Sequence, residues 1–284
     1  MKIGIGLPAT IPGIEGSLIA EWAVKAEELH FSSLGVVDRL VYPNHEPMIS
    51  LAAAATSTER ILLMTTVLLG PLRNHVILAK QAATLQSISA GRFNLGLGIG
   101  IREDDFKAAG VEYSGRGTRL EYQINVMRAI WSGDTDTLGH REVGPPLVKA
   151  PKILMGAFVD NALKRVGRIA DGYLAGPDGP AEVERKFSLV NESWVKAQKT
   201  GKPRLVGGIY YALGDLDRGK KYMRHYYDFI LDETDWSIES MMVEDSKSVK
   251  NLITDFESIG MDELIFHPCV PDIDEINRLA DIVS

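Results

Sequence analysis

The stretch from Ile61 to Phe106 constrains the fold of this chain more than any other segment. It opens with ILLMTTVLLGP, an apolar run of the length and β-branched bias expected of a strand buried on both faces. A helical stripe follows, made of Leu78, Ala82, Leu85 and Ile88. The segment FNLGLGIG then reads as a second strand. A strand, a helix and another strand in this order are typical of a parallel sheet with a crossover helix.

The second of these strands has one bulky and one almost bare face. The bulky residues are Phe93, Leu95 and Leu97, and they alternate with Asn94, Gly96 and Gly98. Because successive side chains of a strand point to opposite faces, the asparagine and the two glycines share one face. We expect this bare face to make room for a flat ligand.

The same alternation of strands and helices continues along the chain. Strands are expected at residues 2–8, 32–38, 61–71, 93–100, 152–158, 171–176, 204–213 and 263–268. Helices are expected at residues 18–30, 48–58, 77–90, 119–131, 161–170, 181–198, 215–231, 246–259 and 272–283, with Asp160 as the N-cap of the fifth. Eight strand-and-helix units predict an α/β fold, a (β/α)8 TIM barrel with insertions after strands 4 and 7. We expect residues 1–284 to form a single domain.

Composition and charge narrow the class of protein. With 284 residues, 45% of them hydrophobic, the chain can bury a large core, and no apolar run reaches the length of a membrane span. The N-terminal MKIGIGLPA passes directly into a strand pattern without a signal-peptide region, so we expect a cytoplasmic protein. The net charge of −7, with both signs interspersed, argues against nucleic acid or an anionic membrane as a partner. The one cysteine, Cys269, excludes a disulfide within the chain and a cysteine-based zinc site.

Function in such a barrel is expected at the carboxyl ends of the strands and in the loops after them. The residues expected there are Asp38, Arg39, Thr66, Val67, residues 98–100, residues 155–158, Ala175, Gly176, Tyr210, Tyr211 and His267. No strand ends in a lysine placed for a Schiff base, no histidine and carboxylate set has metal-ligand spacing, and no GxSxG elbow occurs. A site made of glycines and backbone groups with few ionisable side chains suits a bound cofactor that supplies the reactive atoms. No metal site is expected.

Several motifs give the chain a family resemblance. PLRNHVILAKQAATLQSISAGRFNLGLGIG resembles the strand, helix and strand signature of the bacterial luciferase-like family of flavin and deazaflavin enzymes. Four further stretches are similar to family motifs in the same order: REDDFKAAGV, RGTRLEYQINVMRAIWSG, NALKRVGRIADGYLAG and GMDELIFHPCVPDIDEINRLADIV. The resemblance implies a barrel with an inserted segment that holds reduced FMN or coenzyme F-420 at the mouth formed by the carboxyl strand ends. It also implies a non-proline cis peptide between Thr66 and Val67 that bulges toward the central ring of the flavin.

The resemblance and the position in the predicted barrel assign roles to individual residues. The residues expected to bind the cofactor are Thr66, Val67, Gly98, Gly100, Gly156, Ala157, Ala175 and Gly176. The residues expected to contact the substrate are Leu7, His45, Arg73 and His267. For three of these an alternative stays open: a solvated loop for His45, a surface salt bridge for Arg73, and packing for His267.

Asp38 and Arg39 are the expected catalytic residues, and they depart from the family pattern. Family members often carry an acid followed by a catalytic histidine after the second strand, whereas this chain has Asp38 followed by Arg39. An arginine stays protonated and cannot shuttle a proton, but it can hold an anionic substrate or a flavin oxygen. Luciferase itself holds the FMN phosphate with an arginine where this chain has Ile99. The phosphate is therefore expected on backbone N–H groups and a helix N-terminus near residues 157–161.

The resemblance favours a monooxygenase in which reduced FMN and O2 oxygenate a small organic substrate, with a separate NAD(P)H:flavin reductase as partner. Hydride transfer with coenzyme F-420 is the alternative, because the ending DELIFHP is similar to many deazaflavin-dependent members. A flavin-binding protein without turnover is a rival from another class, since the histidine after Asp38 is missing. A barrel isomerase or aldolase is disfavoured by the lack of a suitable lysine. A homodimer is expected, formed by the helices that start near Met48 and Ile77.

Overall fold

Eight parallel strands close into a barrel in the computed structural model, which describes residues 1–134, 142–229, 237 and 241–283. The barrel strands are β1 (Lys2–Gly6), β2 (Ser33–Val36), β3 (Leu62–Thr65), β5 (Phe93–Gly98), β6 (Lys152–Gly156), β7 (Gly172–Ala175), β8 (Arg204–Tyr211) and β10 (Glu263–Pro268). Each strand pairs in parallel with its neighbour, and β10 pairs with both β1 and β8, which closes the ring. The predicted (β/α)8 barrel is confirmed.

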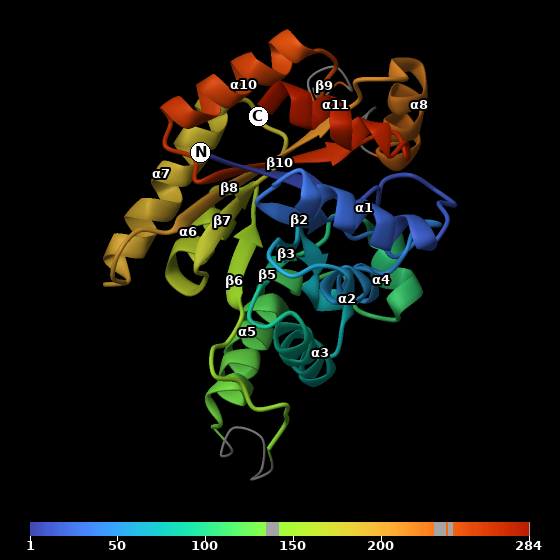
Figure 1. Cartoon of the computed structure of the whole chain (residues 1–284). Helices are drawn as coiled ribbons and strands as arrows, with labels where there is room; N and C mark the ends of the chain where they lie inside the picture. Colours follow the sequence, from blue (N-terminus) through green and yellow to red (C-terminus); the bar gives the residue numbers. More distant parts are fainter. Residues whose placement is uncertain (135–141, 230–236, 238–240, 284) are drawn as a thin grey trace.

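Helices surround the strands (Figure 1). The helices that cover the barrel are α1 (Ser17–Glu28), α2 (Pro47–Ser57), α3 (His75–Ile88), α5 (Arg116–Ser132), α6 (Asp160–Ile169), α7 (Pro180–Lys196), α10 (Ser246–Ser258) and α11 (Asp274–Val283). Each turns an apolar stripe toward the strands, and Trp22, Leu51 and Leu78 in these stripes are completely buried. None of the described helices combines the length and the apolar character needed to cross a membrane.

Two connections between barrel strands carry additional elements. Between β5 and β6, the helix α4 (Glu103–Ala109) precedes α5, and between β8 and β10, the helix α8 (Leu216–Tyr226) and the strand β9 (Met242–Val243) precede α10. The sequence predicts only a loop at residues 100–117, because a helix as short as α4 shows too little periodicity to be recognised. The helix expected at residues 215–231 ends earlier, at Tyr226, and its last two positions lie outside the described residues.

The third strand is interrupted where the sequence predicts one continuous run. It consists of β3 and the short β4 (Leu68–Leu69), and a 3-10 turn (Gly70–Leu72) follows directly. The peptide bond between Thr66 and Val67, which separates the two pieces, is cis, as the resemblance implies. β3 and β4 pair with successive parts of β5, so the interruption lies at the carboxyl end of the barrel.

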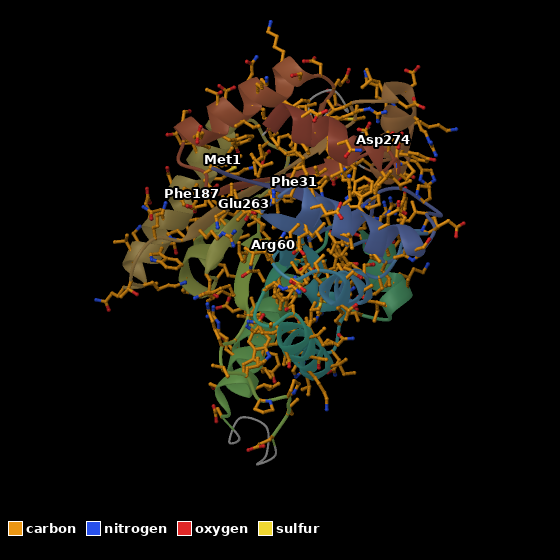
Figure 2. All side chains as sticks on the ribbon, in the orientation of Figure 1. Met1, Phe31, Arg60, Phe187, Glu263 and Asp274 are labelled. Atoms are coloured by element: carbon orange, nitrogen blue, oxygen red, sulfur yellow. The ribbon has the colours of Figure 1, made fainter. Side chains whose placement is uncertain are left out.

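The amino ends of the strands meet around a buried carboxylate, at the end of the barrel away from the predicted site. Glu263 is completely buried and accepts a hydrogen bond from the Ser32 hydroxyl while it pairs with Arg204. Figure 2 shows Glu263 close to Phe31, at the start of β1, β2 and β10. The ion pair satisfies a charge that would otherwise be costly to bury.

The predicted N-cap of α6 is wrong. The helix begins at Asp160 itself, its N-cap is Val159, and no side chain caps its first turn. The Asp160 carboxylate lies 3.5 Å from the Arg185 guanidinium on α7 instead. The sequence pattern predicts that the Asp160 side chain accepts a hydrogen bond from the first turn of α6, but it forms an ion pair with α7 instead.

Arg92 connects the start of β5 to the loop before β3. Its guanidinium donates hydrogen bonds at 2.9 to 3.0 Å to the carbonyl oxygens of Ala55, Thr58, Ile61 and Ser89 and to the Thr58 hydroxyl. We expect Arg92→Met to lower the free energy of unfolding by about 2–4 kcal/mol, because several buried oxygens lose their donor together. Urea denaturation followed by circular dichroism measures this loss.

Arg60 supplies the matched control for that substitution. Arg60 lies in the loop before β3, which Arg92 contacts, but it is exposed. Arg60→Met is therefore expected to change the free energy of unfolding by less than about 0.5 kcal/mol. Equal losses in the two variants would contradict a special role for Arg92.

Candidate functional site

A cavity of about 360 Å³ opens at the carboxyl ends of the barrel strands. Eleven of the fourteen site residues predicted from the sequence line it: Asp38, Arg39, Thr66, Val67, Gly98, Gly100, Gly156, Ala157, Ala175, Gly176 and His267. The structure thus brings both predicted catalytic residues and all predicted cofactor-binding residues to one place. Leu7, His45 and Arg73 are not part of its wall.

Glycines leave the space around the cis peptide open. A Cβ atom on Gly98 would clash with the Val67 side chain, and one on Gly156 would lie 3.1 Å from Val67 Cγ1. A Cβ atom on Gly176 would lie 2.9 Å from the Phe158 ring. Side chains at these positions would fill the wall, so the cavity depends on glycine at the ends of three neighbouring strands.

The prediction that the whole bare face of β5 adjoins the cofactor is wrong. A Cβ atom on Gly96 would collide with the carbonyl oxygen of Thr65, and neither Gly96 nor Asn94 lines the cavity. The Thr65 hydroxyl bridges the strands, donating to the Gly96 carbonyl oxygen at 2.7 Å and accepting from its N–H group at 2.9 Å. The missing side chain of Gly96 lets the backbone of β3 approach β5 closely. Of Asn94, Gly96 and Gly98, Gly98 alone lines the cavity.

Asp38 is a buried carboxylate with one oxygen engaged in two hydrogen bonds. Its Oδ2 atom accepts hydrogen bonds from the Leu69 N–H group at 2.8 Å and from Arg73 at 2.6 Å. Arg73 also lies 3.3 Å from Glu46, which fixes the guanidinium between two acids. Asp38 and Arg73 therefore anchor the end of the interrupted third strand. Arg73 stands behind the cavity wall in a partly buried ion pair.

Arg39 is held in the wall by aromatic rings. Its guanidinium carbon lies 4.5 Å from the Tyr42 ring centre and 5.3 Å from that of Tyr226. A Tyr226 carbonyl oxygen accepts a hydrogen bond from the same guanidinium. A guanidinium in this position cannot accept a proton, but it can hold an anion.

The structure adds cavity residues that the sequence reasoning missed. Among them are Arg102, Asp105, Arg116, Tyr226, Tyr227 and Phe229. The aromatic run HYYDF at residues 225–229 was a usable signal, because large aromatic side chains are mostly buried. The arginines carried no such signal, since their loops are irregular and their final position depends on tertiary packing.

Neutral hydroxyl groups line one side of the cavity. The Tyr210 and Tyr227 hydroxyl oxygens lie 2.7 Å apart, and burial raises the pKa of Tyr227 to about 12. Burial likewise raises the pKa of Tyr210 well above its ordinary value. Both tyrosines are therefore protonated at neutral pH and act as hydrogen-bonding groups without charge.

His267 forms the floor of the cavity and also packs against the barrel interior. It is 4% exposed, and its Nε2 atom lies 3.4 Å from the Thr66 hydroxyl. A Cβ atom on Gly6 would collide with its ring, and one on Gly208 would lie 3.4 Å away, so glycines make room for the imidazole. Its Nδ1 atom has no hydrogen-bond partner within the described residues. Burial lowers the pKa of His267 to about 4, so the ring is neutral at pH 7.

The shifted pKa makes His267 an acid-sensitive element of the fold. Because the folded protein binds this proton with a pKa of about 4 and the unfolded chain near 6.5, the unfolded state takes up the proton first as pH falls. Between pH 7 and pH 5, we expect the wild type to lose about 2 kcal/mol more free energy of unfolding than His267→Gln. Urea denaturation at several pH values measures how the free energy of unfolding of each protein depends on pH. An identical dependence in the two proteins would contradict the buried neutral imidazole.

Two of the residues predicted to contact the substrate lie beside a different and much smaller cavity. Leu7 is buried there, and His45 is at its edge, with its Nε2 atom 3.1 Å from the Ile14 carbonyl oxygen. This places His45 in a loop contact outside the main cavity. Their contact with a substrate stays a prediction.

Groups that could hold a phosphate follow two neighbouring strands, β5 and β6, at the cavity mouth. The first turn of α6 has backbone N–H groups without partners in the helix, and the Asp160 carboxylate points toward Arg185. Arg116 lines the cavity, and its Nε atom donates to the Gly100 carbonyl oxygen at 3.0 Å. Arg116 therefore brings a guanidinium beside Ile99, where luciferase has its arginine. Within the described residues, no three histidine, cysteine or acidic side chains could hold a metal ion.

Sequence comparison relates the chain to known proteins over most of its length. The family model described as luciferase-like monooxygenase matches residues 1–254. An uncharacterised protein of Mycobacterium tuberculosis is 31% identical over 170 residues, which cover 57% of this chain and 60% of that protein. The chain thus matches about three fifths of the length of this curated relative.

Two solved structures resemble the whole chain. One is an F420-dependent secondary alcohol dehydrogenase in complex with an F420-acetone adduct, with a TM-score of 0.86, 18% identity and coverage of 99% of this chain and 98% of that chain. The other is the oxygenating constituent of 3,6-diketocamphane monooxygenase from Pseudomonas putida in complex with FMN, a type II Baeyer–Villiger monooxygenase. Its TM-score is 0.77 at 18% identity, with coverage of 99% of this chain and 95% of that chain. At this identity the likeness establishes the fold.

Proposed function

The chain belongs to the luciferase-like monooxygenase family, and from this premise we propose that it is a monooxygenase that uses reduced FMN and O2 on a small organic substrate. The observation that carries the proposal is the cavity at the carboxyl ends of the strands, with its glycine walls around Thr66 and Val67. Its volume of about 360 Å³ falls in the range of small-molecule sites.

The carboxylates in the described cavity wall support chemistry carried by a cofactor. Asp38 is paired with Arg73, and Asp105 accepts a hydrogen bond from the Val41 N–H group at 2.7 Å. Burial also raises the pKa of Asp105. Since both acids serve as structural acceptors, the reaction that suits this cavity is one in which the protein positions and shields the reactants.

The cavity residues divide into three tasks under this proposal. Gly98, Gly156 and Gly176 leave room for the cofactor ring, while Arg116 and the first turn of α6 hold its phosphate. The aromatic side chains of residues 226, 227 and 229 cover the opposite side and exclude water. When bound, reduced FMN supplies two electrons to O2, so that one oxygen atom enters the substrate and the other leaves as water.

Hydride transfer with coenzyme F-420 is the second candidate. It is supported by the ending DELIFHP, which is similar to many deazaflavin-dependent members, and by the F420-dependent secondary alcohol dehydrogenase that has the same fold. The same glycine walls would accommodate a deazaflavin ring. In this case the residues keep their positioning tasks, and a hydride passes between the substrate and the ring without O2.

Oxygen incorporation separates the candidates. Purified protein is incubated with FMN, a flavin reductase, NADH and isotopically labelled O2 against a panel of small ketones and aromatic acids, and in parallel with F-420 without oxygen. One labelled oxygen atom in a product supports the monooxygenase, whereas substrate-dependent bleaching or formation of F-420 absorbance supports the second candidate. Binding of either cofactor without turnover would favour a carrier protein. If neither cofactor raises the melting temperature, both proposals are overturned.

The partners and the assembly follow from the same proposal. We expect a separate NAD(P)H:flavin reductase to supply the reduced FMN, and we expect a cytoplasmic homodimer. The exposed Ile49 on α2 and Ile77 on α3, at 68% and 59%, suit an interface formed by this helix pair. Light scattering that returns the mass of a monomer would contradict the dimer.

A further inference from the structure

Arg39 has unusual surroundings for a residue in a cavity wall. Its side chain is 6% exposed, and its guanidinium is fixed over the rings of Tyr42, Tyr226 and Phe229. The Phe229 ring centre lies 5.7 Å from the guanidinium carbon. This enclosure keeps the cation inside the wall and prevents it from turning outward to water.

The positive charge of Arg39 is only weakly neutralised by the side chains around it. Its Nε atom is buried without a hydrogen-bond partner within the described residues. Its ion pair there is with Asp228, whose Oδ1 atom lies 3.6 Å from Nη2, which is too long for a hydrogen bond. The Asp228 side chain is 62% exposed, so the pair is screened by solvent. Arg73, by contrast, donates to the Asp38 carboxylate at 2.6 Å.

Arg102 approaches the same point from the loop after β5. Its guanidinium carbon lies 4.3 Å from the Phe229 ring centre, and its Nη1 atom lies 3.6 Å from the same Asp228 oxygen. That Nη1 atom is also buried without a hydrogen-bond partner in the part of the chain that the structure describes. Asp104 pairs with the other edge of the Arg102 guanidinium, with its Oδ1 atom 3.0 Å from Nε and its Oδ2 atom on Nη2, so Nη1 is the donor left for a further anion. One buried guanidinium group, that of Arg39, and one partly buried group, that of Arg102, therefore converge on one carboxylate oxygen.

We propose that the substrate is a small organic carboxylate whose carboxyl group binds Arg39 and Arg102 from the cavity, on the side away from Asp228, with its apolar part against Phe229 and Tyr226. The proposal rests on the proposed function, because it assigns the substrate class of the same cavity. Both arginines line the cavity and Asp228 does not, so an anion inside can reach them from the other side. Arginine forks suit a carboxylate because they donate two parallel hydrogen bonds.

The barrel geometry favours a substrate over the cofactor phosphate at this point. In the ring of strands, β2, which leads to Arg39, stands opposite β7, which leads to Gly176. The first turn of α6, where a phosphate is expected, follows β6, three strands away from β2. The Arg39 side of the mouth is thus three strands away from the first turn of α6 and remains for the second reactant.

Matched pairs of neutral and anionic probes test the proposal. Benzoate and benzamide, and hexanoate and hexanamide, are titrated by calorimetry into the protein, both cofactor-free and loaded with FMN or F-420. We expect at least one carboxylate to bind about tenfold or more tightly than its amide. Arg39→Gln is expected to remove this preference, and Asp228→Asn to strengthen carboxylate binding about threefold by removing the competing charge. Arg60→Gln, a surface change of the same charge, should leave all affinities unchanged within about twofold.

Equal binding of carboxylates and amides by the wild type, or failure of both carboxylates to bind, overturns the proposal. A preference that survives Arg39→Gln also overturns it, provided that the variant keeps the wild-type circular dichroism spectrum. If Arg39→Gln weakens FMN but not riboflavin, the guanidinium holds the cofactor phosphate and the proposal is wrong. Failure of the proposed function itself gives a different result, namely a wild type that binds neither FMN nor F-420.

Discussion

Replacing Gly156 with leucine is expected to lower the affinity for FMN and for F-420 by roughly 100-fold, or about 2.8 kcal/mol. Gly156 ends β6 in the cavity wall, and a Cβ atom there already lies 3.1 Å from Val67 Cγ1. The remaining atoms of a leucine side chain must therefore extend into the space where the cofactor ring is expected. Fluorescence titration of each cofactor measures the loss.

Two further glycine variants make the Gly156 result interpretable. Gly156→Ala adds one methyl group and is expected to weaken binding by roughly tenfold, with little change in melting temperature. Gly16→Leu changes an exposed glycine at the N-cap of α1, where the nearest atom to a new Cβ is 3.9 Å away. It should leave cofactor affinity within about twofold of the wild type. Unchanged binding in a folded Gly156→Leu protein would show that the ring lies elsewhere.

Removal of the partner of Asp38 is expected to have the largest effect on stability. Arg73→Met leaves a carboxylate that is 2% exposed with the Leu69 N–H group as its remaining donor among the described contacts. An uncompensated buried charge costs about 3–5 kcal/mol, so the melting temperature should fall by roughly 10 °C. Thermal unfolding and urea denaturation at pH 7 measure the two quantities.

A double substitution separates the buried charge from lost packing. Asp38→Asn in the Arg73→Met background removes the charge while it keeps an acceptor for the Leu69 N–H group. The double variant should therefore be more stable than Arg73→Met alone by about 2 kcal/mol. A double variant that is equally unstable would mean that the loss comes from packing of the Arg73 side chain.

Local patterns in the sequence predict the strands, the helices and their order, because these depend on interactions between residues close together in the chain. Apolar strands and striped helices alternate because each unit must bury one face, and this alternation fixes the barrel and the end where the strand termini meet. The residues at or just after the carboxyl ends of the strands, such as Asp38, Gly98 and Gly156, are therefore placed correctly by counting strands. The family resemblance adds the cis peptide at Thr66 and Val67.

Contacts between distant segments decide the features that the sequence does not reveal. Gly96 looks like Gly98 in the sequence, but the Thr65 carbonyl oxygen fills its space because β3 passes there. Arg39 meets the Tyr226 carbonyl oxygen, which lies far away along the chain. Such pairs depend on how long connections fold over the barrel mouth, and neither periodicity nor spacing encodes that path.

The central claim is that the cavity at the barrel mouth holds a flavin or deazaflavin ring. Its most direct test is a crystal structure of the protein grown with whichever cofactor, FMN or F-420, raises its melting temperature. We expect the ring within the cavity, against Val67 and beside Gly98, Gly156 and Gly176, with Arg39 on the side left for the substrate. A bound cofactor outside this cavity, or an empty cavity at saturating cofactor, would contradict it.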